Sequence, residues 1–240
     1  AGARFPPVAL WGVGGAGPRE ARALWAREDV ARRVWRRLQT VALPGHRMAD
    51  AVPVWAVPDF LTRQDVPGLL DAAEFEQQRL RSRRQTASLA PGAPVVAALR
   101  RRIAQAFGVD GACLEPPRLV QYSRAGDEFE PHVDWIVDAS DSQLALLGQR
   151  VATALVYVND VPADAGGETY FPHLGFRMAP AAGQALLWPN VGPDGMPLAS
   201  TQHAAMPLLR DGVQKLAVNV WVRDRPLPTD QETLNNLYLS

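Results

Sequence analysis

The chain has 240 residues, enough for one domain with a sizeable core or for one domain with an appendage. Its Lys+Arg and Asp+Glu totals are equal, at 25 each, so net charge gives no reason to expect nucleic acid or an anionic membrane as a partner. No apolar run approaches the roughly 18–20 residues of a membrane span. The N-terminus lacks the pattern of a signal peptide, and the single cysteine, Cys113, has no internal disulfide partner. Together these features predict a protein of a reducing compartment, the cytoplasm.

The first half of the chain is predicted to be mainly helical. Residues 18–40 carry apolar side chains at three- and four-residue steps. Residues 59–79 and 95–107 have the pattern of two further helices: Thr62 and Asp65 have the spacing of an N-terminal cap for the first, and Gly108 ends the second. Residues 52–57 form an expected strand, whereas residues 80–93 are polar and interrupted by proline.

A run of arginines lies in the first expected helix: Arg32, Arg33, Arg36 and Arg37. Such a run occurs in nucleic-acid-binding patches, but it is more often the solvated face of a helix, which is our interpretation here. The predicted organisation is a helical extension or linker in residues 1–50, the principal domain in residues 51–228 and a tail in residues 229–240. The extension is a candidate docking element for a protein partner, and the pattern indicates no oligomeric state.

From residue 116 onward, short apolar runs alternate with clusters of Gly, Pro, Asn and Asp. This pattern is typical of antiparallel strands joined by turns. The expected strands are residues 118–123, 132–137, 151–159, 184–189 and 215–223. They predict an α+β, mainly β, fold in which a sandwich or barrel carries helices 59–79 and 95–107 on its outside.

Two histidines and one aspartate are candidate metal ligands. His132 and Asp134 are two residues apart, so in a strand their side chains would point to the same face. His203 would complete a set that leaves three positions of an iron ion open for a cosubstrate and oxygen. Each signal is weak alone, because His-x-Asp occurs often by chance and a single histidine more often bonds to a backbone carbonyl.

The expected strand 215–223 has one wholly apolar face. The other face is formed by Lys215, Ala217, Asn219 and Trp221. A lysine that points into a cavity is costly without an anion, and a dicarboxylate would supply one; the alternative is a lysine in water at the mouth of the sheet. On the expected strand 151–159, Thr153 is placed to donate a hydrogen bond to a bound carboxylate.

The order of the motifs is more specific than any one of them. It runs Tyr122, Gly126, Phe129-Glu-Pro-His132-Val-Asp134, Arg150-Val-Ala-Thr153, Gly166-Gly-Glu-Thr169-Tyr-Phe171-Pro172, Gly183-x-Ala-Leu-Leu-Trp188, His203, Gly212-x-x-Lys215 and Trp221. Over roughly residues 52–225, this order resembles the prolyl 4-hydroxylase family of iron(II)/2-oxoglutarate-dependent dioxygenases, and in particular its bacterial members.

The resemblance implies a double-stranded β-helix, or jelly roll. It also implies a site for each cofactor: Fe(2+) bound by His132, Asp134 and His203, and 2-oxoglutarate bound by Lys215 with help from Thr153 and Tyr122. O2 would be the oxidant, and ascorbate is a further cofactor to test. Arg150 and Trp221 match family residues near the substrate and the metal, and they are the predicted catalytic residues. Tyr122 lies one residue further from Gly126 than in the family, which leaves open whether its side chain faces the pocket.

The resemblance further implies hydroxylation of an unactivated C–H bond in a peptidyl or free amino acid, with conversion of 2-oxoglutarate to succinate and carbon dioxide. One alternative is a natural-product tailoring hydroxylase that acts on a small-molecule or carrier-bound substrate, and another is a catalytically inactive jelly-roll binding module. Halogenation is disfavoured, since Asp134 occupies the position that a halide would need. Residues 80–93, 138–148 and 190–202 are expected lids that set substrate choice.

Overall fold

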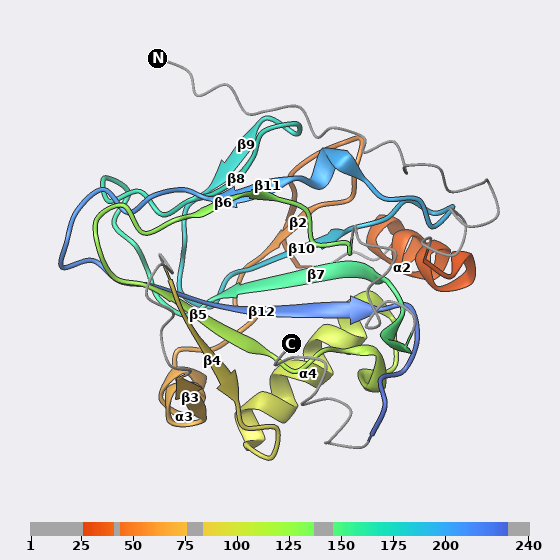
Figure 1. The fold of residues 1–240 in the computed structure, drawn as a ribbon, viewed down its shortest axis with the longest axis horizontal. Coiled ribbons are helices and arrows are strands. Elements are labelled where there is room, and N and C mark those ends of the chain that lie inside the picture. Colours follow the sequence, from red (N-terminus) through yellow and green to blue (C-terminus); the bar gives the residue numbers. More distant parts are fainter. Residues whose placement is uncertain (1–25, 41–43, 76–83, 137–145, 230–240) are drawn as a thin grey trace.

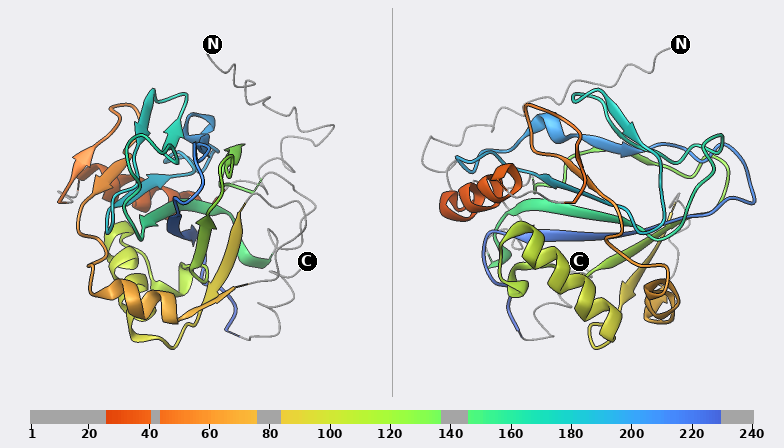
Figure 2. Two further views of the ribbon diagram at one scale, coloured as in Figure 1. Left: turned by 90° about the vertical axis from the view of Figure 1, so that its left-hand side faces the viewer. Right: turned by 180° about the vertical axis from the view of Figure 1, so that it is seen from behind.

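Two antiparallel sheets face one another, and helices cover the outer face of the larger sheet (Figures 1 and 2). The structure is a computed structural model that describes residues 26–40, 44–75, 84–136 and 146–229. This arrangement confirms the predicted mainly β jelly roll with supporting helices. Within these ranges, no helix has the length and apolar character needed to cross a membrane.

The larger sheet contains eight strands and the smaller sheet four. In spatial order the larger sheet consists of β1 (His46–Arg47), β2 (Trp55–Val57), β10 (Ala185–Pro189), β7 (Arg150–Tyr157), β12 (Lys215–Arg223), β5 (Arg118–Tyr122), β4 (Gln85–Leu89) and β3 (Ala73–Phe75). The smaller sheet consists of β6 (Phe129–His132), β11 (His203–Ala205), β8 (Thr169–Phe171) and β9 (Phe176–Met178). Two 3₁₀ turns, Gly111–Cys113 and Ala199–Thr201, complete the regular elements.

The main core lies between the larger sheet and its helices. The helices are α2 (Glu28–Thr40), α3 (Asp65–Asp71) and α4 (Pro94–Phe107). Leu99 and Ile103 of α4 are fully buried in one cluster with Val218 and Val220 of β12. Because side chains alternate along a strand, the opposite face of β12 is directed toward the smaller sheet. The functional site therefore lies between the two sheets, on the side away from the helices.

Helix α2 belongs to this same core through its buried Val34 and Leu38. Its arginine-rich side is exposed, and there Arg32 pairs with Glu28 on the next turn. This geometry supports the solvated-face interpretation of the run. The boundaries proposed for the domains stay a prediction, and residues 18–25 of the expected first helix lie outside the described part.

The segment between residues 59 and 93 differs from its prediction. Helix α3 is short, although Thr62 and Asp65 do exchange reciprocal hydrogen bonds of the capping-box type, at 3.0 and 3.2 Å. The chain then forms β3, within the segment 59–79 that was expected to be helical. β3 pairs with β4, which lies in the segment 80–93 that was expected to be an irregular lid. Ala87 and Leu89 of β4 are buried, so pairing and packing together override the local polar composition. Residues 76–83 lie outside the described part.

One expected strand needs correction, and two expected lids stay predictions. The strand expected at residues 132–137 is β6, which begins at Phe129 and ends at His132, so Asp134 lies beyond its end. The segment 190–202, expected as a lid, is buried at both ends and exposed at Pro193, Asp194 and Met196, and Val191 forms a bridge with Pro197. Its role in substrate choice stays a prediction. Of the third expected lid, 138–148, residues 138–145 lie outside the described part.

Candidate metal centre and cosubstrate pocket

His132, Asp134 and His203 come together between the two sheets. His203 opens β11 and is the cross-strand partner of His132 at the end of β6, with ring centroids 4.3 Å apart. His132 Nε2 lies 3.5 Å from Asp134 Oδ1, and His203 Nε2 lies 3.8 Å from Asp134 Oδ2. One ligand atom from each residue falls within 4.8 Å of the others. Neighbouring strands, and not sequence spacing alone, thus assemble the three side chains.

Each histidine ring is fixed through its other nitrogen. Nδ1 of His132 donates to the carbonyl oxygen of Glu130 at 2.8 Å, and Nδ1 of His203 donates to that of Thr201 at 3.0 Å. These bonds leave Nε2 as the acceptor atom on both rings, directed toward Asp134. Histidines bound to a metal are held in this way, and two imidazoles with one carboxylate suit Fe(II). The donor set therefore fits the iron ion that the sequence resemblance implies.

The surroundings of His203 and Asp134 keep both residues in the forms that bind a metal. Burial lowers the pKa of His203 to about 4, assisted by the nearby His132, so the ring is neutral at pH 7. Burial alone would raise the pKa of Asp134, but His203, His132 and a hydrogen bond from Thr153 together hold it below its ordinary value. A neutral imidazole and an ionised carboxylate are the forms that ligate metals.

Asp134 is oriented by a directed chain of hydrogen bonds from the larger sheet. Nδ2 of Asn190 donates to Oγ1 of Thr153 at 2.9 Å, and Oγ1 of Thr153 donates to Oδ2 of Asp134 at 2.7 Å. All three side chains are buried. The Thr153 hydroxyl is therefore directed to Asp134 and not, as the resemblance implied, to the pocket around Lys215. We assign Thr153 and Asn190 to positioning Asp134. No local sequence pattern pointed to Asn190.

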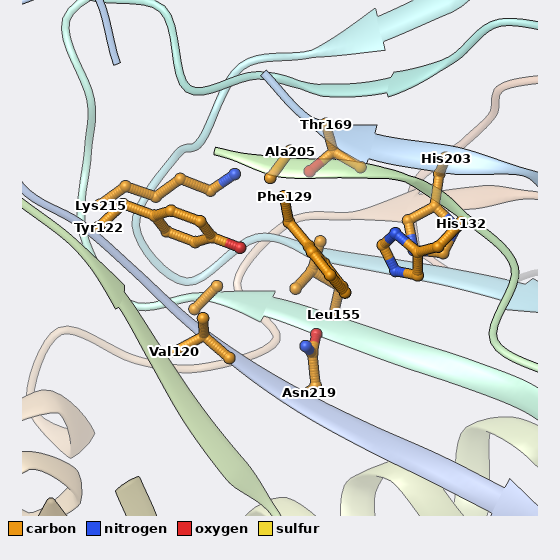
Figure 3. A pocket seen from close by; sticks show the side chains of 11 residues that line it. Val120, Tyr122, Phe129, His132, Leu155, Thr169, His203, Ala205, Lys215 and Asn219 are labelled. Carbon is orange, nitrogen blue, oxygen red and sulfur yellow. The ribbon is translucent and has the colours of Figure 1, made fainter. Parts of the chain in front are cut away.

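Lys215 points into a cavity beside the two histidines (Figure 3). Its side chain is 2% exposed, and no carboxylate among the described residues forms an ion pair with it. Burial lowers its pKa to about 7, partly offset by Glu168. Lys215 is the only lysine in the sequence. A buried ammonium without a paired anion indicates a site for an anionic ligand.

The side chain of Tyr122 faces the same cavity, which resolves the question left open by its spacing. Lys215 and Tyr122 are cross-strand partners on β12 and β5, and Nζ lies 5.1 Å from the centre of the tyrosine ring. Figure 3 shows the ammonium and the phenol hydroxyl on the same side of Phe129, which lies between them and the histidines. Burial raises the pKa of Tyr122, so the phenol stays protonated and remains a hydrogen-bond donor.

Two further polar residues belong to this pocket and were not predicted as site residues. Thr169 of β8 lines the cavity, and its Oγ1 accepts a hydrogen bond from the hydroxyl of Tyr157 at 2.8 Å. Tyr157 is fully buried, and its ring centre lies 5.9 Å from Nζ of Lys215. A signal for Tyr157 existed, because it shares a strand face with Thr153 and Leu155. Thr169 follows a Gly-Gly pair that by itself indicates only a turn.

Arg150 and Trp221 lie together beside the metal ligands His132 and Asp134. The guanidinium carbon of Arg150 is 3.8 Å from the centre of the Trp221 ring. Arg150 also makes a two-bond ion pair with the buried Glu115, at 2.6 and 2.9 Å, and Glu115 pairs in addition with the buried Arg223. Both predicted catalytic residues line a second cavity together with His132 and Asp134. Their catalytic roles stay predictions.

Comparisons with known proteins agree with this geometry. Residues 117–223 match the 2OG-Fe(II) oxygenase superfamily. Prolyl 4-hydroxylase subunit alpha-1 of Gallus gallus is 37% identical over 134 residues, which are 55% of this chain and 25% of that protein. Subunit alpha-2 of Caenorhabditis elegans is 32% identical over 151 residues, or 60% of this chain and 27% of that protein. The chain thus spans about a quarter of the length of these curated relatives.

Solved structures show the same fold. The viral collagen prolyl hydroxylase of Paramecium Bursaria Chlorella virus-1 superposes with a TM-score of 0.57 and 23% identity, over 71% of this chain and 94% of that chain. A prolyl-4-hydroxylase of Pseudomonas putida has a TM-score of 0.51 and 23% identity, over 82% of this chain and 99% of that chain. The sequence matches confirm the resemblance over residues 117–223, which match the 2OG-Fe(II) oxygenase superfamily and are similar to prolyl 4-hydroxylase subunits, and the solved structures show that the fold is shared.

Proposed function

We propose that the protein is an iron(II)- and 2-oxoglutarate-dependent dioxygenase that hydroxylates an unactivated C–H bond. The proposal rests on one observation: a candidate metal site and a candidate anion site lie side by side between the two sheets. The set His132, Asp134 and His203 lies beside a cavity that ends at the buried Lys215. A jelly-roll binding module without activity would not need both an iron-type ligand set and a buried cation for a dicarboxylate.

The residues of the chain bind, orient and shield the reactants. Iron and 2-oxoglutarate, when bound, supply the oxidation of a C–H bond with release of succinate and carbon dioxide. His132, Asp134 and His203 would hold the ion, while Lys215 would pair with the distal carboxylate of the dicarboxylate through a charge-assisted hydrogen bond. Tyr122 and Thr169 are placed to donate to that same carboxylate. The apolar side chains of Val120, Phe129 and Leu155 line the same cavity.

A peptidyl or free amino acid, with proline the first choice, is the substrate class that we propose. The support is the similarity to prolyl 4-hydroxylase subunit alpha-1, which is 37% identical over 134 residues. A natural-product or carrier-bound substrate is the second candidate, because the loops that select a substrate vary independently of the fold. The cytoplasmic location and a docking role for residues 1–50 also stay predictions.

The deciding experiment measures iron binding and succinate release with purified protein under controlled oxygen. The wild type is expected to bind one Fe(II) and to convert 2-oxoglutarate to succinate, faster in the presence of a proline substrate. Asp134→Ala should lose both properties while its circular dichroism stays that of a folded protein. Asp50→Ala, at an exposed aspartate far from the ligand set in sequence, is the matched control. A wild type that binds no iron, or an Asp134→Ala variant with full activity, would contradict the proposal.

A further inference from the structure

Three polar side chains surround the end of the cosubstrate cavity that lies away from the metal ligands. They are Lys215 of β12, Tyr122 of β5 and Thr169 of β8, and Figure 3 shows their polar atoms directed toward the same space. The amide of Asn219 also lines the cavity, but it lies four residues along β12 from Lys215, roughly 13 Å by the rise of a strand. An ammonium group only donates hydrogen bonds, whereas a hydroxyl can donate and accept. The two hydroxyls therefore decide what this end of the cavity recognises.

The hydroxyl of Tyr157 determines the direction of the Thr169 hydroxyl. It donates to Oγ1 of Thr169 at 2.8 Å, and both side chains are buried. Within the described part of the chain, Thr169 Oγ1 is the only hydrogen-bond partner of the Tyr157 hydroxyl. The reverse direction would leave the phenol hydrogen of Tyr157 buried without an acceptor, which is costly. Thr169 thus accepts from Tyr157 and keeps its own hydrogen for a ligand in the cavity.

The ionisation of Tyr157 cannot disturb this direction near neutral pH. Burial raises the pKa of Tyr157 well above its ordinary value, so the phenol keeps its hydrogen. Tyr122 has a similar arrangement, since its phenol forms a side-chain hydrogen bond with Arg84, a group that can only donate. Neither Tyr157 nor Arg84 lines the cavity, so each acts on it from behind a residue that does.

We propose that Tyr157, acting through Thr169, makes the Lys215 end of the cavity a site of hydrogen-bond donors and so selects a carboxylate over a carboxamide of the same shape. This inference rests on the proposed function and deepens it by naming a positioning residue for the distal carboxylate of the cosubstrate. A carboxylate only accepts hydrogen bonds, whereas the NH2 group of a carboxamide would face donors and stay unpaired. A site built on hydrogen bonds rejects a ligand that leaves its groups unpaired.

The test is a binding measurement with two ligands that differ only at the distal group. N-oxalylglycine has the two carboxylates of 2-oxoglutarate with an NH in place of one methylene, and N-oxalylglycinamide carries a carboxamide at the distal end. Isothermal titration calorimetry is carried out without oxygen on protein loaded with Fe(II), at about pH 6.5, where the Lys215 amine is mostly charged.

Four variants are compared with the wild type: Tyr157→Phe, Thr169→Val, the double variant of these two, and Tyr170→Phe. Tyr157→Phe keeps the ring and removes only the hydroxyl. Tyr170 follows Thr169 on β8, so its side chain points to the other face of the strand, where its ring lies against Arg177. Since Tyr170 does not line the cavity, Tyr170→Phe removes the same hydroxyl group elsewhere and is the matched control.

The wild type is expected to bind the carboxylate ligand about 100-fold or more tightly than the carboxamide, with Lys215 contributing to this ratio in every variant. Tyr157→Phe should weaken binding of N-oxalylglycine and reduce the ratio about tenfold, because the Thr169 hydroxyl can then turn and accept. In the Thr169→Val background the same substitution should change neither quantity, since Tyr157 acts only through that hydroxyl. Tyr170→Phe should behave as the wild type.

Two results would overturn the inference: an unchanged ratio in Tyr157→Phe, or an equal loss of affinity when residue 169 is valine. The second result would show that Tyr157 acts by packing, which would weaken both ligands alike. Thermal unfolding of each variant checks that it is folded. A wild type that binds neither ligand is a different outcome, which contradicts the proposed function itself and with it this inference.

Discussion

The two faces of β12 differ in what their side chains do. On the face toward the helices, Val218, Val220 and Val222 are fully buried in the main core. On the face toward the smaller sheet, Lys215, Asn219 and Trp221 line the two cavities. One strand therefore contributes stability through one face and ligand binding through the other. Substitutions on the two faces should consequently affect different measurements, and four predictions test this separation.

The largest effect is expected from Lys215→Met, which keeps the length of the side chain and removes its charge. Loss of a charge-assisted contact to the cosubstrate should weaken 2-oxoglutarate binding about 100-fold. The melting temperature without ligand should stay equal or rise, because a buried charge without a paired anion is removed. Calorimetric titration and thermal unfolding with and without 2-oxoglutarate measure both quantities. An unchanged affinity for 2-oxoglutarate would mean that a residue other than Lys215 contacts its carboxylate.

Thr153→Val should weaken metal binding about 10- to 100-fold, the range found when the partner of a metal ligand is lost. Valine has nearly the same shape as threonine but cannot donate to Asp134, and it also leaves the amide of Asn190 without its acceptor. Thr153→Ser, which keeps the hydroxyl, is the matched control and should bind metal almost normally. Competition titration with a metal chelator gives the affinities. Equal metal affinity in Thr153→Val and the wild type would mean that Thr153 does not position Asp134 for metal binding.

The third prediction concerns pH and follows from the pKa of Lys215, which burial lowers to about 7. A dicarboxylate binds the protonated amine of Lys215. The affinity for 2-oxoglutarate is therefore highest below this pKa and declines as the pH rises through the pKa. Above pH 7 the dissociation constant of 2-oxoglutarate should increase by up to about tenfold per pH unit, until the pKa of the complex is reached. Lys215→Arg stays charged over this range and should give a flatter profile between pH 6.5 and 8.5. A flat wild-type profile would mean that the amine is charged throughout.

The smallest effect on ligand binding is expected from Val220→Ala, on the apolar face. Removal of two buried carbon atoms should lower the free energy of unfolding by about 2 kcal/mol, from lost burial and the cavity that remains. The affinity for 2-oxoglutarate should stay within about twofold, since the two faces do not share side-chain contacts. Denaturant unfolding measures the free energy of unfolding, and the same calorimetric titration measures the affinity for 2-oxoglutarate. A large loss of cosubstrate affinity would show that the two faces are coupled.

The residues that sequence reasoning placed correctly are those whose position depends on local periodicity. β12 has the expected bounds, and its alternation put Lys215 and Asn219 on the face that lines the cavities. The strand pattern predicted a sandwich or barrel, and the family resemblance carried by the ordered motifs implied the jelly roll. His203 was a weak candidate ligand on its own, because its spacing from Asp134 carries no geometric information, and the same resemblance strengthened that assignment.

The parts that failed depend on contacts between segments far apart in the chain. β4 reads as a polar, irregular stretch until its pairing with β3 and β5 is known. Asp134 reaches the site beyond the end of β6, held by Thr153 from the other sheet, and not by the alternation of a strand. The buried Glu115, which anchors Arg150, precedes Pro116 in a segment with no functional pattern. Side-chain partners of this kind are set by tertiary packing, which sequence periodicity does not encode.

Lys215 has a further consequence for the chemical handling of this protein. Because it is the only lysine and its pKa is about 7, a large part of its amine is uncharged and nucleophilic at neutral pH. Acylating reagents and aldehydes that normally modify many surface lysines have one side-chain target here, at the end of the cosubstrate pocket. We expect bound 2-oxoglutarate to slow the reaction of such reagents with Lys215, since both would occupy the same pocket.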